Sequence, residues 1–421
     1  MKTLRVGGTI RAASDKSISH RALMLAAVAK GKSHIKNILA SADVLTTADV
    51  LRALGAAIPP ISDDLVVTGQ APRYLKSPAA PLHCGNSGTT ARLMAGVVAG
   101  AGLTAEFRGD ESLSRRPMRR VAQPLTLMGA NVRLSAHGGL PMTIAGGPLQ
   151  AIEWDSPVAS AQVKGSILLA AVLGGVQATV RESHRSRDHT ELMLSARGVA
   201  VQVHGNRVAV DAAQIVRPAD IDVPADPSSA AFFVALALLA GAGELRLTDV
   251  CLNPTRTGLL EALRRMGGNL EVGERREEGG EHVGSIVARP SQLRGIDVSA
   301  EDVPSMIDEL PLLACVAARA SGVTTVRGAG ELRVKESDRI ATIVNNLRAL
   351  GVDARELDDG FEVTGSRTPL RGRVETHGDH RIAMSFGVLG ALPANTIAVS
   401  EPDCVGVSYP DFWRHLQSAC R

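Results

Sequence analysis

The sequence has few aromatic residues and almost no imbalance of charge. Aromatic side chains make up 2% of the 421 residues, and the formal net charge is +3. Proteins that bind single-stranded nucleic acid stack bases on aromatic rings, and proteins that bind duplexes present a broad basic surface. We therefore expect no nucleic-acid partner.

Cysteine pairs and cofactor motifs are also missing. The five cysteines are far apart and form no Cys-x-x-Cys pair, which argues against a disulfide framework or a cysteine zinc site. The sequence contains no His-Glu-x-x-His motif, no P-loop, and no Gly-x-Gly-x-x-Gly motif after a strand. The sequence thus predicts no metal, no cofactor, and cysteines that stay reduced in a cytoplasmic protein.

Long hydrophobic runs are absent as well. The longest apolar run, residues 230–243, is too short to span a bilayer and is more typical of a buried helix. The N-terminal residues MKTLRVGGTI include no apolar segment of signal-peptide length. We expect a cytoplasmic protein that binds no membrane, and we expect it to be a monomer.

One pattern recurs along the chain. A polar segment is followed by an apolar helix of three or four turns and then by a glycine, at intervals of 67 to 81 residues. The glycines are Gly31, Gly100, Gly174, Gly241, Gly322 and Gly390. Six segments of one size indicate a repeated structural unit.

A second helix signal lies between these apolar helices. Segments such as LRALGAAI and LRALGVDA predict a half-polar helix that ends at a glycine and runs into β-prone sequence. The last segment lacks this signal because the chain ends soon afterwards. The unit is therefore strand, apolar helix, strand, amphipathic helix and strand pair, and the apolar helix must be enclosed within its domain.

The chain length favours two domains, and six units give three to each. The midpoint falls near residues 221–229, IDVPADPSS, where prolines and small polar residues are typical of a hinge. If the enclosed helices run parallel, their N-termini converge at one end of each domain. Such N-termini attract anions, so two ends facing each other would form an anion-binding cleft.

The first half of the chain places cations and hydroxyls at these N-termini. Lys16, Ser17 and Arg21 could hold a carboxylate or a phosphate, although a capped helix with solvated charges also explains them. Asn86 to Thr90 could cradle a phosphate or form a capped turn. Further polar residues are Ser160, Gln162, Lys164, Arg187 and His189, of which the histidine alone is more typical of a structural role. Pro117 would fix Arg116 at the start of a helix.

The second half places acids among its cations. Asp308 and Glu309 begin an apolar helix, where one of them could serve only as a cap. Lys335 and Arg339 lie four residues apart, and on one helix face they would repel unless an anion lies between them. Together with Glu336 and Arg381, these residues suit an enzyme that joins two anionic small molecules by acid/base chemistry.

The ordered motifs resemble those of the EPSP synthase (3-phosphoshikimate 1-carboxyvinyltransferase) family of enolpyruvyl transferases. The matching segments, which extend over essentially the whole chain, are SDKSISHRAL, GNSGTTAR, RRPM, SAQVKG, SRDHTE, MIDELP, RVKESDR and GDHRIAM. The resemblance implies an α/β fold of two similar domains, each with three βαβαββ repeats and enclosed parallel helices, an inside-out α/β barrel. It also implies a discontinuous domain of residues 1–13 with 226–421, a second domain of 14–225, and hinges near 13–14 and 223–228.

The implied reaction transfers the carboxyvinyl group of phosphoenolpyruvate to the 5-hydroxyl of 3-phosphoshikimate, without a cofactor, on the route to chorismate. By resemblance, Asp308 is the base, Glu336 is the acid, and Lys16 contacts both substrates. The implied 3-phosphoshikimate ligands are Lys16, Ser17, Arg21, Ser160, Ala161, Gln162, Arg187, Asp308 and Lys335. The implied phosphoenolpyruvate ligands are Lys16, Asn86, Gly88, Thr89, Arg116, Gln162, Arg339 and Arg381. The discontinuous domain would then carry phosphoenolpyruvate and the acid/base residues, and the other domain would carry 3-phosphoshikimate.

One departure and two rival interpretations remain. Val407 stands where some relatives carry a lysine, so one phosphate contact is missing or comes from elsewhere. A UDP-N-acetylglucosamine 1-carboxyvinyltransferase would share the fold and the donor, but it would carry Lys-Asn in place of Lys16-Ser17. A non-catalytic anion-binding protein would explain the helix N-termini but not Asp308 and Glu336.

Overall fold

A single pattern of strands and helices is repeated along the chain, and its third copy shows it most plainly. This copy comprises β8 (Ile152–Ser156), α6 (Ala161–Gly174), β9 (Ala178–Glu182), α7 (His189–Ser195), β10 (Val201–His204) and β11 (Arg207–Val210). Strand β8 pairs parallel to β9, β9 pairs antiparallel to β11, and β11 pairs antiparallel to β10. The copy is therefore a parallel βαβ unit extended by an antiparallel strand pair.

The computed structural model describes residues 3–421, which divide into two compact units. Unit 1 comprises the described residues of Met1–Ala13, with Pro224–Arg276 and His282–Arg421. Unit 2 comprises Ser14–Val223 and the short segment Glu277–Glu281. The domain boundaries expected from the sequence did not place this short segment with the second unit.

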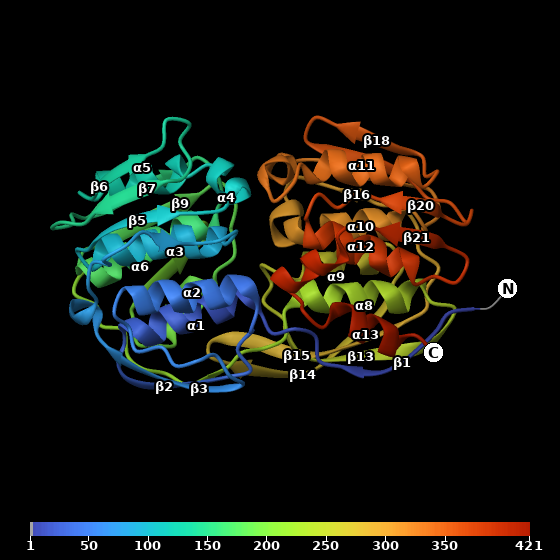
Figure 1. Cartoon of the computed structure of the whole chain (residues 1–421). Coiled ribbons are helices and arrows are strands. Elements are labelled where there is room, and N and C mark those ends of the chain that lie inside the picture. The colour runs from blue at the N-terminus through green and yellow to red at the C-terminus, as the bar shows by residue number, and fades with distance from the viewer. Residues whose placement is uncertain (1–2) are drawn as a thin grey trace. The chain divides into compact units, whose positions relative to one another are not determined.

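Unit 2 contains the first three copies. The first has α1 (Lys16–Val28), β2 (Lys30–Lys36), α2 (Ala42–Ala53) and β3 (Asp64–Gln70). The second has β4 (Leu82–His83), α3 (Gly88–Gly100), β5 (Thr104–Arg108), α4 (Glu111–Arg115), α5 (Arg119–Leu127), β6 (Asn131–Leu134) and β7 (Met142–Ala145). The third copy, described above, completes the unit (Figure 1).

Unit 1 contains the last three copies. The fourth has α8 (Pro227–Leu239), β13 (Ala242–Cys251), α9 (Gly258–Arg265), β14 (Asn269–Glu278) and β15 (Glu281–Arg289). The fifth has β16 (Asp297–Val298), α10 (Leu310–Ala317), β17 (Val323–Val326), α11 (Arg339–Ala349), β18 (Ala354–Leu357) and β19 (Gly360–Thr364). The sixth has β20 (Arg371–Val374), α12 (His380–Gly390), β21 (Thr396–Val399) and α13 (Phe412–Ala419).

The sixth copy corrects one expectation. The sequence showed no second helix signal there, yet the structure forms α13 with buried Phe412, Leu416 and Ala419. No strand pair follows α13 within residues 3–421, and β20 and β21 form a two-stranded sheet. The half-polar character of this short helix was not recognised because no glycine and no β-prone segment follow it.

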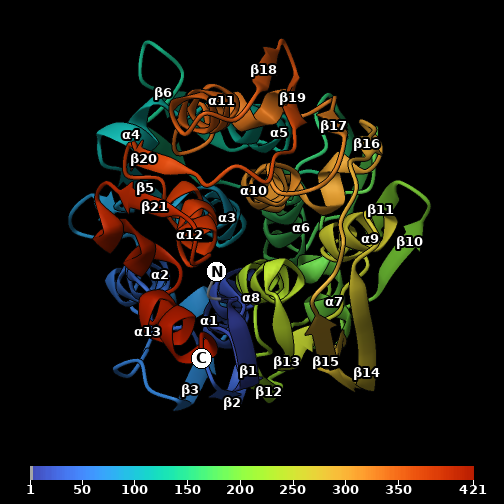
Figure 2. The same cartoon turned by 90° about the vertical axis from the view of Figure 1, so that its right-hand side faces the viewer.

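The apolar helices α1, α3, α6, α8, α10 and α12 are enclosed, as predicted. In unit 2, α3 and α6 touch through glycine, since a Cβ at Gly96 would lie 2.1 Å from the carbonyl oxygen of Ser166. In unit 1, α8, α10 and α12 pack against one another, and Figure 2 shows them nearly end-on with α9, α11 and α13 farther out. The α/β fold class with three repeats per unit is confirmed.

Several of the scarce aromatic residues gather in one place in unit 1. The rings of Phe232 and Phe412 lie 5.6 Å apart, and those of Phe233 and Tyr409 lie 6.0 Å apart, in edge-to-face arrangements. The Trp413 ring lies 4.9 Å from that of Phe412. This cluster fixes the last helix, α13, against the enclosed helix α8.

Each of the five amphipathic helices predicted from the sequence is followed by a glycine in the left-handed region. The five glycines have φ values between 78° and 106°: Gly55, Gly129, Gly198, Gly267 and Gly351. Only glycine adopts this conformation without strain, so it turns the chain into the next strand. The predicted stop signals are confirmed.

Two parallel strand pairs join distant parts of the sequence, and in one of them β1 crosses to the other half of the chain. Strand β1 (Arg5–Ile10) pairs parallel to β13 in unit 1, with Arg5 opposite Ala242. Strand β12 (Ile221–Asp222) pairs parallel to β2 in unit 2, with Ile221 opposite Ile35. Each unit thus obtains the first strand of one sheet from a distant part of the sequence.

Candidate active site

In unit 1, an arginine joins the acids of three segments. Arg339, the first residue of α11, is 1% exposed at its side chain. Its guanidinium lies 2.8 Å from Asp379, 2.7 Å from Glu336 and 3.4 Å from Asp308. Burial alone would lower the pKa of Arg339, but these carboxylates outweigh burial and raise it. Arg339 is therefore a fixed positive charge at the centre of an acidic cluster.

Asp308 lies among three cations. Its carboxylate is 3.4 Å from Arg339, 3.7 Å from the Lys335 ammonium and 3.7 Å from the Arg381 guanidinium. Arg381 also donates a hydrogen bond of 3.2 Å to the Asp308 carbonyl oxygen. The side chain of Asp308 is 13% exposed, so this carboxylate remains accessible while its charge is compensated.

The arrangement of Lys335 and Arg339 corrects the sequence interpretation. They do not share a helix face, because Lys335 is extended after a short 3₁₀ helix (Gly330–Val334) and α11 begins only at Arg339. The Asp338 side chain accepts from the Ala341 backbone N–H and so caps α11 at this point. The anion expected between the two cations is the carboxylate of Asp308.

The N-termini of the three enclosed helices of unit 1 are connected. Asp379 caps α12 and Asp226 caps α8 by accepting backbone N–H groups. Arg256 contacts Asp226 at 3.0 Å and donates to Ser228, which donates to Glu309 at the start of α10. No backbone N–H of α10 is capped by the Glu309 side chain, so capping does not explain this acid.

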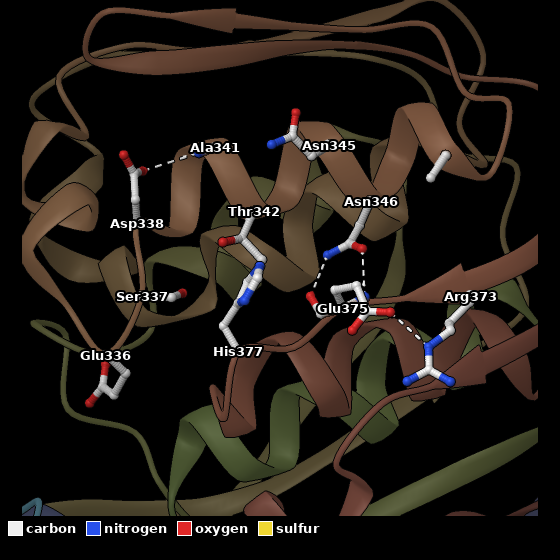
Figure 3. Close-up of a pocket in the computed structure, with 11 residues that line it drawn as sticks. Glu336, Ser337, Asp338, Ala341, Thr342, Asn345, Asn346, Arg373, Glu375 and His377 are labelled. Carbon is white, nitrogen blue, oxygen red and sulfur yellow. Dashed lines mark hydrogen bonds and ion pairs between the residues drawn. The ribbon is translucent and has the colours of Figure 1, made fainter. Parts of the chain in front are cut away.

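A pocket adjoins Glu336. It has a volume of about 590 Å³ and is lined largely by polar residues of α11 and of the segment from Arg373 to His377. Figure 3 shows Glu336 at one end of the lining and the Asn346 amide paired with the backbone of Glu375 farther along. Glu336, which is 24% exposed at its side chain, therefore contacts Arg339 and also borders this pocket.

In unit 2, the first helix N-terminus carries Lys16 and Arg21. Asp15 caps α1, and Lys16 forms an ion pair of 3.0 Å with Asp43. Arg21 is buried and donates to the Thr190 hydroxyl at 2.8 Å and to the Ser17 carbonyl oxygen at 3.0 Å. Burial lowers the pKa of Arg21 to about 10, so it stays charged at neutral pH. Arg21 thus contacts Ser17, whereas Lys16 pairs with Asp43.

Hydroxyl groups connect α1 with α3. Ser87 caps α3 and also accepts a hydrogen bond from the Thr90 hydroxyl at 2.7 Å. Thr90 pairs with Thr47 at 2.7 Å, and Thr47 pairs with Nδ1 of His20 at 2.6 Å. Burial lowers the pKa of His20 to about 3, so the imidazole is neutral and this network carries no charge. The alternative of a capped turn is therefore correct for Ser87, one residue before Gly88.

The arginines at α3 surround Gly88. Arg116 donates to the Asn86 side chain, and a Cβ at Gly88 would lie 3.5 Å from its Nη1 atom. The sequence analysis expected Pro117 to place Arg116 at the start of a helix, and this is wrong. Arg116 follows the end of α4 in an extended conformation. The reason is that α5 begins only at Arg119, after Met118.

A further arginine was missed by the sequence analysis. Arg92 donates to Gln162 at 2.6 Å, and Gln162 donates in turn to the Thr89 hydroxyl at 2.9 Å. A Cβ at Gly88 would lie 3.1 Å from the Nη1 atom of Arg92. The signal was present, because Arg92 is four residues after Gly88 and so returns to the same helix face. Arg92 connects the N-termini of α3 and α6.

The N-terminus of α6 includes a second correction. Ser160 caps this helix at Val163, and Ala161 and Gln162 form its first turn. Lys164 is not available to a substrate, since it is buried between Glu182 at 2.9 Å and Glu191 at 2.8 Å. Both acids come from other elements of the repeat, which local sequence did not reveal.

The remaining predicted residues lie near these N-termini. Arg187 is partly buried two residues before α7, and its charge acts on that of Arg21. His189 is fully buried and contacts Glu281 at 2.6 Å, in agreement with a structural role. Val407 ends a 3₁₀ helix (Pro402–Val407) that packs against α12. The structure therefore forms two polar clusters, one at the enclosed helix N-termini of each unit.

Comparison with known proteins identifies the family. Residues 1–416 match the family model for EPSP synthase (3-phosphoshikimate 1-carboxyvinyltransferase). A curated 3-phosphoshikimate 1-carboxyvinyltransferase from Sulfurihydrogenibium sp. is 45% identical over 100% of this chain and 99% of its own length. The solved structure of EPSP synthase from Acinetobacter baumannii has a TM-score of 0.88 at 38% identity and covers 100% of this chain and 97% of that one. The enolpyruvyl transferase NikO from Streptomyces tendae, at 19% identity and a TM-score of 0.77 over 99% of this chain and 96% of that one, shares the fold. The chain belongs to the EPSP synthase family.

Proposed function

We propose that the protein transfers the carboxyvinyl group of phosphoenolpyruvate to the 5-hydroxyl of 3-phosphoshikimate and releases phosphate. The family match over nearly the whole chain supports this transferase reaction, in the synthesis of chorismate and aromatic amino acids, over UDP-N-acetylglucosamine as acceptor. The structural observation that carries the proposal is the Asp308 carboxylate among Lys335, Arg339 and Arg381, with Glu336 on the same arginine.

Asp308 and Glu336 are the proposed acid/base pair. In the addition step, Asp308 takes the proton of the 5-hydroxyl as its oxygen bonds to C2 of phosphoenolpyruvate. Glu336 gives a proton to C3, so a tetrahedral intermediate forms. Return of a C3 proton to the Glu336 carboxylate and cleavage of the C–O bond to phosphate then give the enol ether and free phosphate. Each proton transfer needs a positioned carboxyl group, and the anionic substrates need cations to offset their charge.

We propose that most of the residues that bind 3-phosphoshikimate belong to unit 2. Arg21 and Lys16 supply positive charge, and the start of α6 supplies hydroxyl, amide and backbone donors. The proposed ligands are Lys16, Ser17, Arg21, Ser160, Ala161, Gln162 and Arg187, with Asp308 and Lys335 at the reacting hydroxyl. A helix N-terminus favours the phosphate, because its backbone N–H groups are unpaired there.

Phosphoenolpyruvate binding is proposed at the cations around Gly88 and Arg339. The absence of a side chain at Gly88 lets two guanidinium groups lie close to the N-terminus of α3. The proposed ligands are Lys16, Asn86, Gly88, Thr89, Arg116, Gln162, Arg339 and Arg381. We assign the phosphoenolpyruvate and acid/base functions to the domain 1–13 with 226–421, and hinges to residues near 13–14 and 223–228.

The test is a phosphate-release assay with phosphoenolpyruvate and either 3-phosphoshikimate or UDP-N-acetylglucosamine. We expect turnover with 3-phosphoshikimate alone, and identification of the enolpyruvyl product by mass spectrometry. Turnover with the nucleotide sugar alone would contradict the proposal. The assay is run without added metal or cofactor, because we propose that the reaction needs neither.

The state and location of the protein are further proposals. We propose that it acts as a monomer in the cytoplasm on two small molecules. No helix between residues 3 and 421 has the length and apolar character that crossing a membrane requires. Gel filtration with light scattering would measure the mass in solution, and a dimer would contradict the first point.

A further inference from the structure

Three consecutive residues at the start of α7 hold three different elements of unit 2. His189 contacts Glu281 at 2.6 Å, Thr190 accepts from Nε of Arg21 at 2.8 Å, and Glu191 contacts Lys164 at 2.8 Å. Glu191 and Lys164 are 3% and 1% exposed, and His189 and Glu281 are fully buried. The first turn of α7 is thus a junction between α1, α6 and the turn that carries Glu281.

Glu281 reaches this junction from a distant part of the chain. It lies where β14 and β15 meet, and this turn belongs to unit 2 although most of both strands belongs to unit 1. Two glycines let the turn fit closely, since a Cβ at Gly279 would lie 2.9 Å from the Ile221 side chain and one at Gly280 would lie 3.0 Å from the Leu192 carbonyl oxygen. Glu278 also accepts from the backbone N–H of Asp222 at 3.2 Å. The turn is therefore seated firmly on α7 and β12.

The chemistry of His189 and Glu281 decides which side chain donates their hydrogen bond. When Glu281 is ionised, its carboxylate can only accept a hydrogen bond, and Nδ1 of His189 is then the donor in this contact. The carboxylate thereby holds the imidazole in one orientation, and the next residue, Thr190, directs its hydroxyl at Arg21. The negative charges of Glu191, Asp15 and Glu281 also act on Arg21 and favour its charged form.

We propose that Glu281 is a positioning residue for the 3-phosphoshikimate site and acts through His189 and Thr190 on Arg21. This inference rests on the proposed function, because it takes Arg21 as a ligand of 3-phosphoshikimate. Glu281 itself does not touch the substrate. It fixes the junction from which the Arg21 guanidinium is aimed.

The experiment compares Michaelis constants for the two substrates in the full-length protein. Glu281→Leu removes the acceptor of His189, and we expect about a tenfold higher KM for 3-phosphoshikimate with KM for phosphoenolpyruvate changed less than about twofold. Glu281→Gln keeps an acceptor oxygen and should stay within about threefold of the unchanged protein. Glu277→Leu, an exposed acid in the same turn, is the matched control and should change neither constant.

A second variant protects the test against poor folding of Glu281→Leu. Thr190→Val removes the hydroxyl that Arg21 donates to and should raise KM for 3-phosphoshikimate to a similar degree. The double variant Thr190→Val with Glu281→Leu should then have a KM for 3-phosphoshikimate no higher than that of the more impaired single variant, since both substitutions act on one contact. Equal losses for both substrates, multiplied losses in the double variant, or no loss in Thr190→Val would overturn the inference.

The experiment distinguishes failure of the positioning role of Glu281 from failure of the proposed function. If the unchanged protein turns over 3-phosphoshikimate and the Glu281 and Thr190 variants bind it normally, only the positioning role fails. If the unchanged protein has no activity with 3-phosphoshikimate, the proposed function fails instead.

Discussion

The two units share one repeat architecture but hold the arginines of their polar clusters in different ways. In unit 1, Arg339 and Arg381 are held by carboxylates of the same cluster. In unit 2, Arg21, Arg92 and Arg116 each donate to neutral oxygen atoms of hydroxyl, carbonyl or amide groups. In the proposed function, the acids and cations that meet in unit 1 serve proton transfer, and the arginines oriented by neutral groups in unit 2 serve anion binding.

The largest expected effect is in unit 1. Asp308→Ala should lower kcat about a thousandfold, because a positioned base contributes this order of rate enhancement. Binding of 3-phosphoshikimate, measured by calorimetry without phosphoenolpyruvate, should persist. Asp308→Asn is the control for side-chain size and should lose as much activity. Near-normal turnover in either variant would contradict the assignment of Asp308 in unit 1 as the base.

Glu336 should rank second. Glu336→Gln keeps an oxygen that can accept from Arg339 but cannot supply a proton, so we expect kcat to fall about a hundredfold. Both KM values should change little. A rise in KM with unchanged kcat would show that Glu336 binds substrate and does not transfer a proton, which would weaken the contrast between the units.

The neutral network of unit 2 predicts a dependence of stability on pH. His20 has a folded pKa of about 3, below the value of about 6.5 expected when unfolded. Below pH 6.5 the unfolded state binds the additional proton, so the contribution of His20 is full above that pH and is lost as the pH falls toward 3. Its share of the free energy of unfolding should be about 2 kcal/mol lower at pH 5 than at pH 7. Denaturant unfolding of His20→Gln should show a smaller loss than the unchanged protein, whereas the exposed-site control His83→Gln should match it.

Gly88→Ala should have the smallest of these effects. Its Cβ would lie 3.1 Å from Arg92, whose guanidinium must shift, and at an ordinary contact distance of 3.5 Å from Arg116. We expect KM for phosphoenolpyruvate to rise about tenfold, the value of one weakened charged contact, with KM for 3-phosphoshikimate unchanged. Gly147→Ala, where a Cβ has nothing within 4 Å, is the matched control. An equal rise for both substrates would contradict separate anion sites.

Much of the fold could be predicted because its signals are local. An apolar helix must be buried, and a glycine such as Gly55 or Gly351 must stop an amphipathic helix where φ is positive. Both signals repeat along the chain, so the six units were visible without contacts. The last unit was less visible because its strand pair is missing.

The sequence predicted which types of residue form the candidate site, but not which residues form ion pairs with one another. Nothing near Lys164 in the sequence shows that Glu182 and Glu191 neutralise it, because both pairs form only in the folded repeat. Lys335 and Arg339 had helical spacing, yet the cap at Asp338 separates them. Glu281 had no local signal at all, since its role depends on a turn seated on a helix far away in sequence.

The pairing of β1 with a strand far along the chain affects the order in which the protein can fold during its synthesis. Strand β1 leaves the ribosome first, but its parallel partner β13 begins only at Ala242, and the sheet of β2 and β3 waits for β12. Domains usually fold as they emerge; the sheets of unit 2 can close once β12 is made, whereas β1 must wait for a strand of the second half. The nascent chain must therefore shield an unpaired N-terminal strand for most of its synthesis. A gene cut near residue 224 should leave β1 without its partner strand in the N-terminal fragment, so activity should return only when both fragments are produced together.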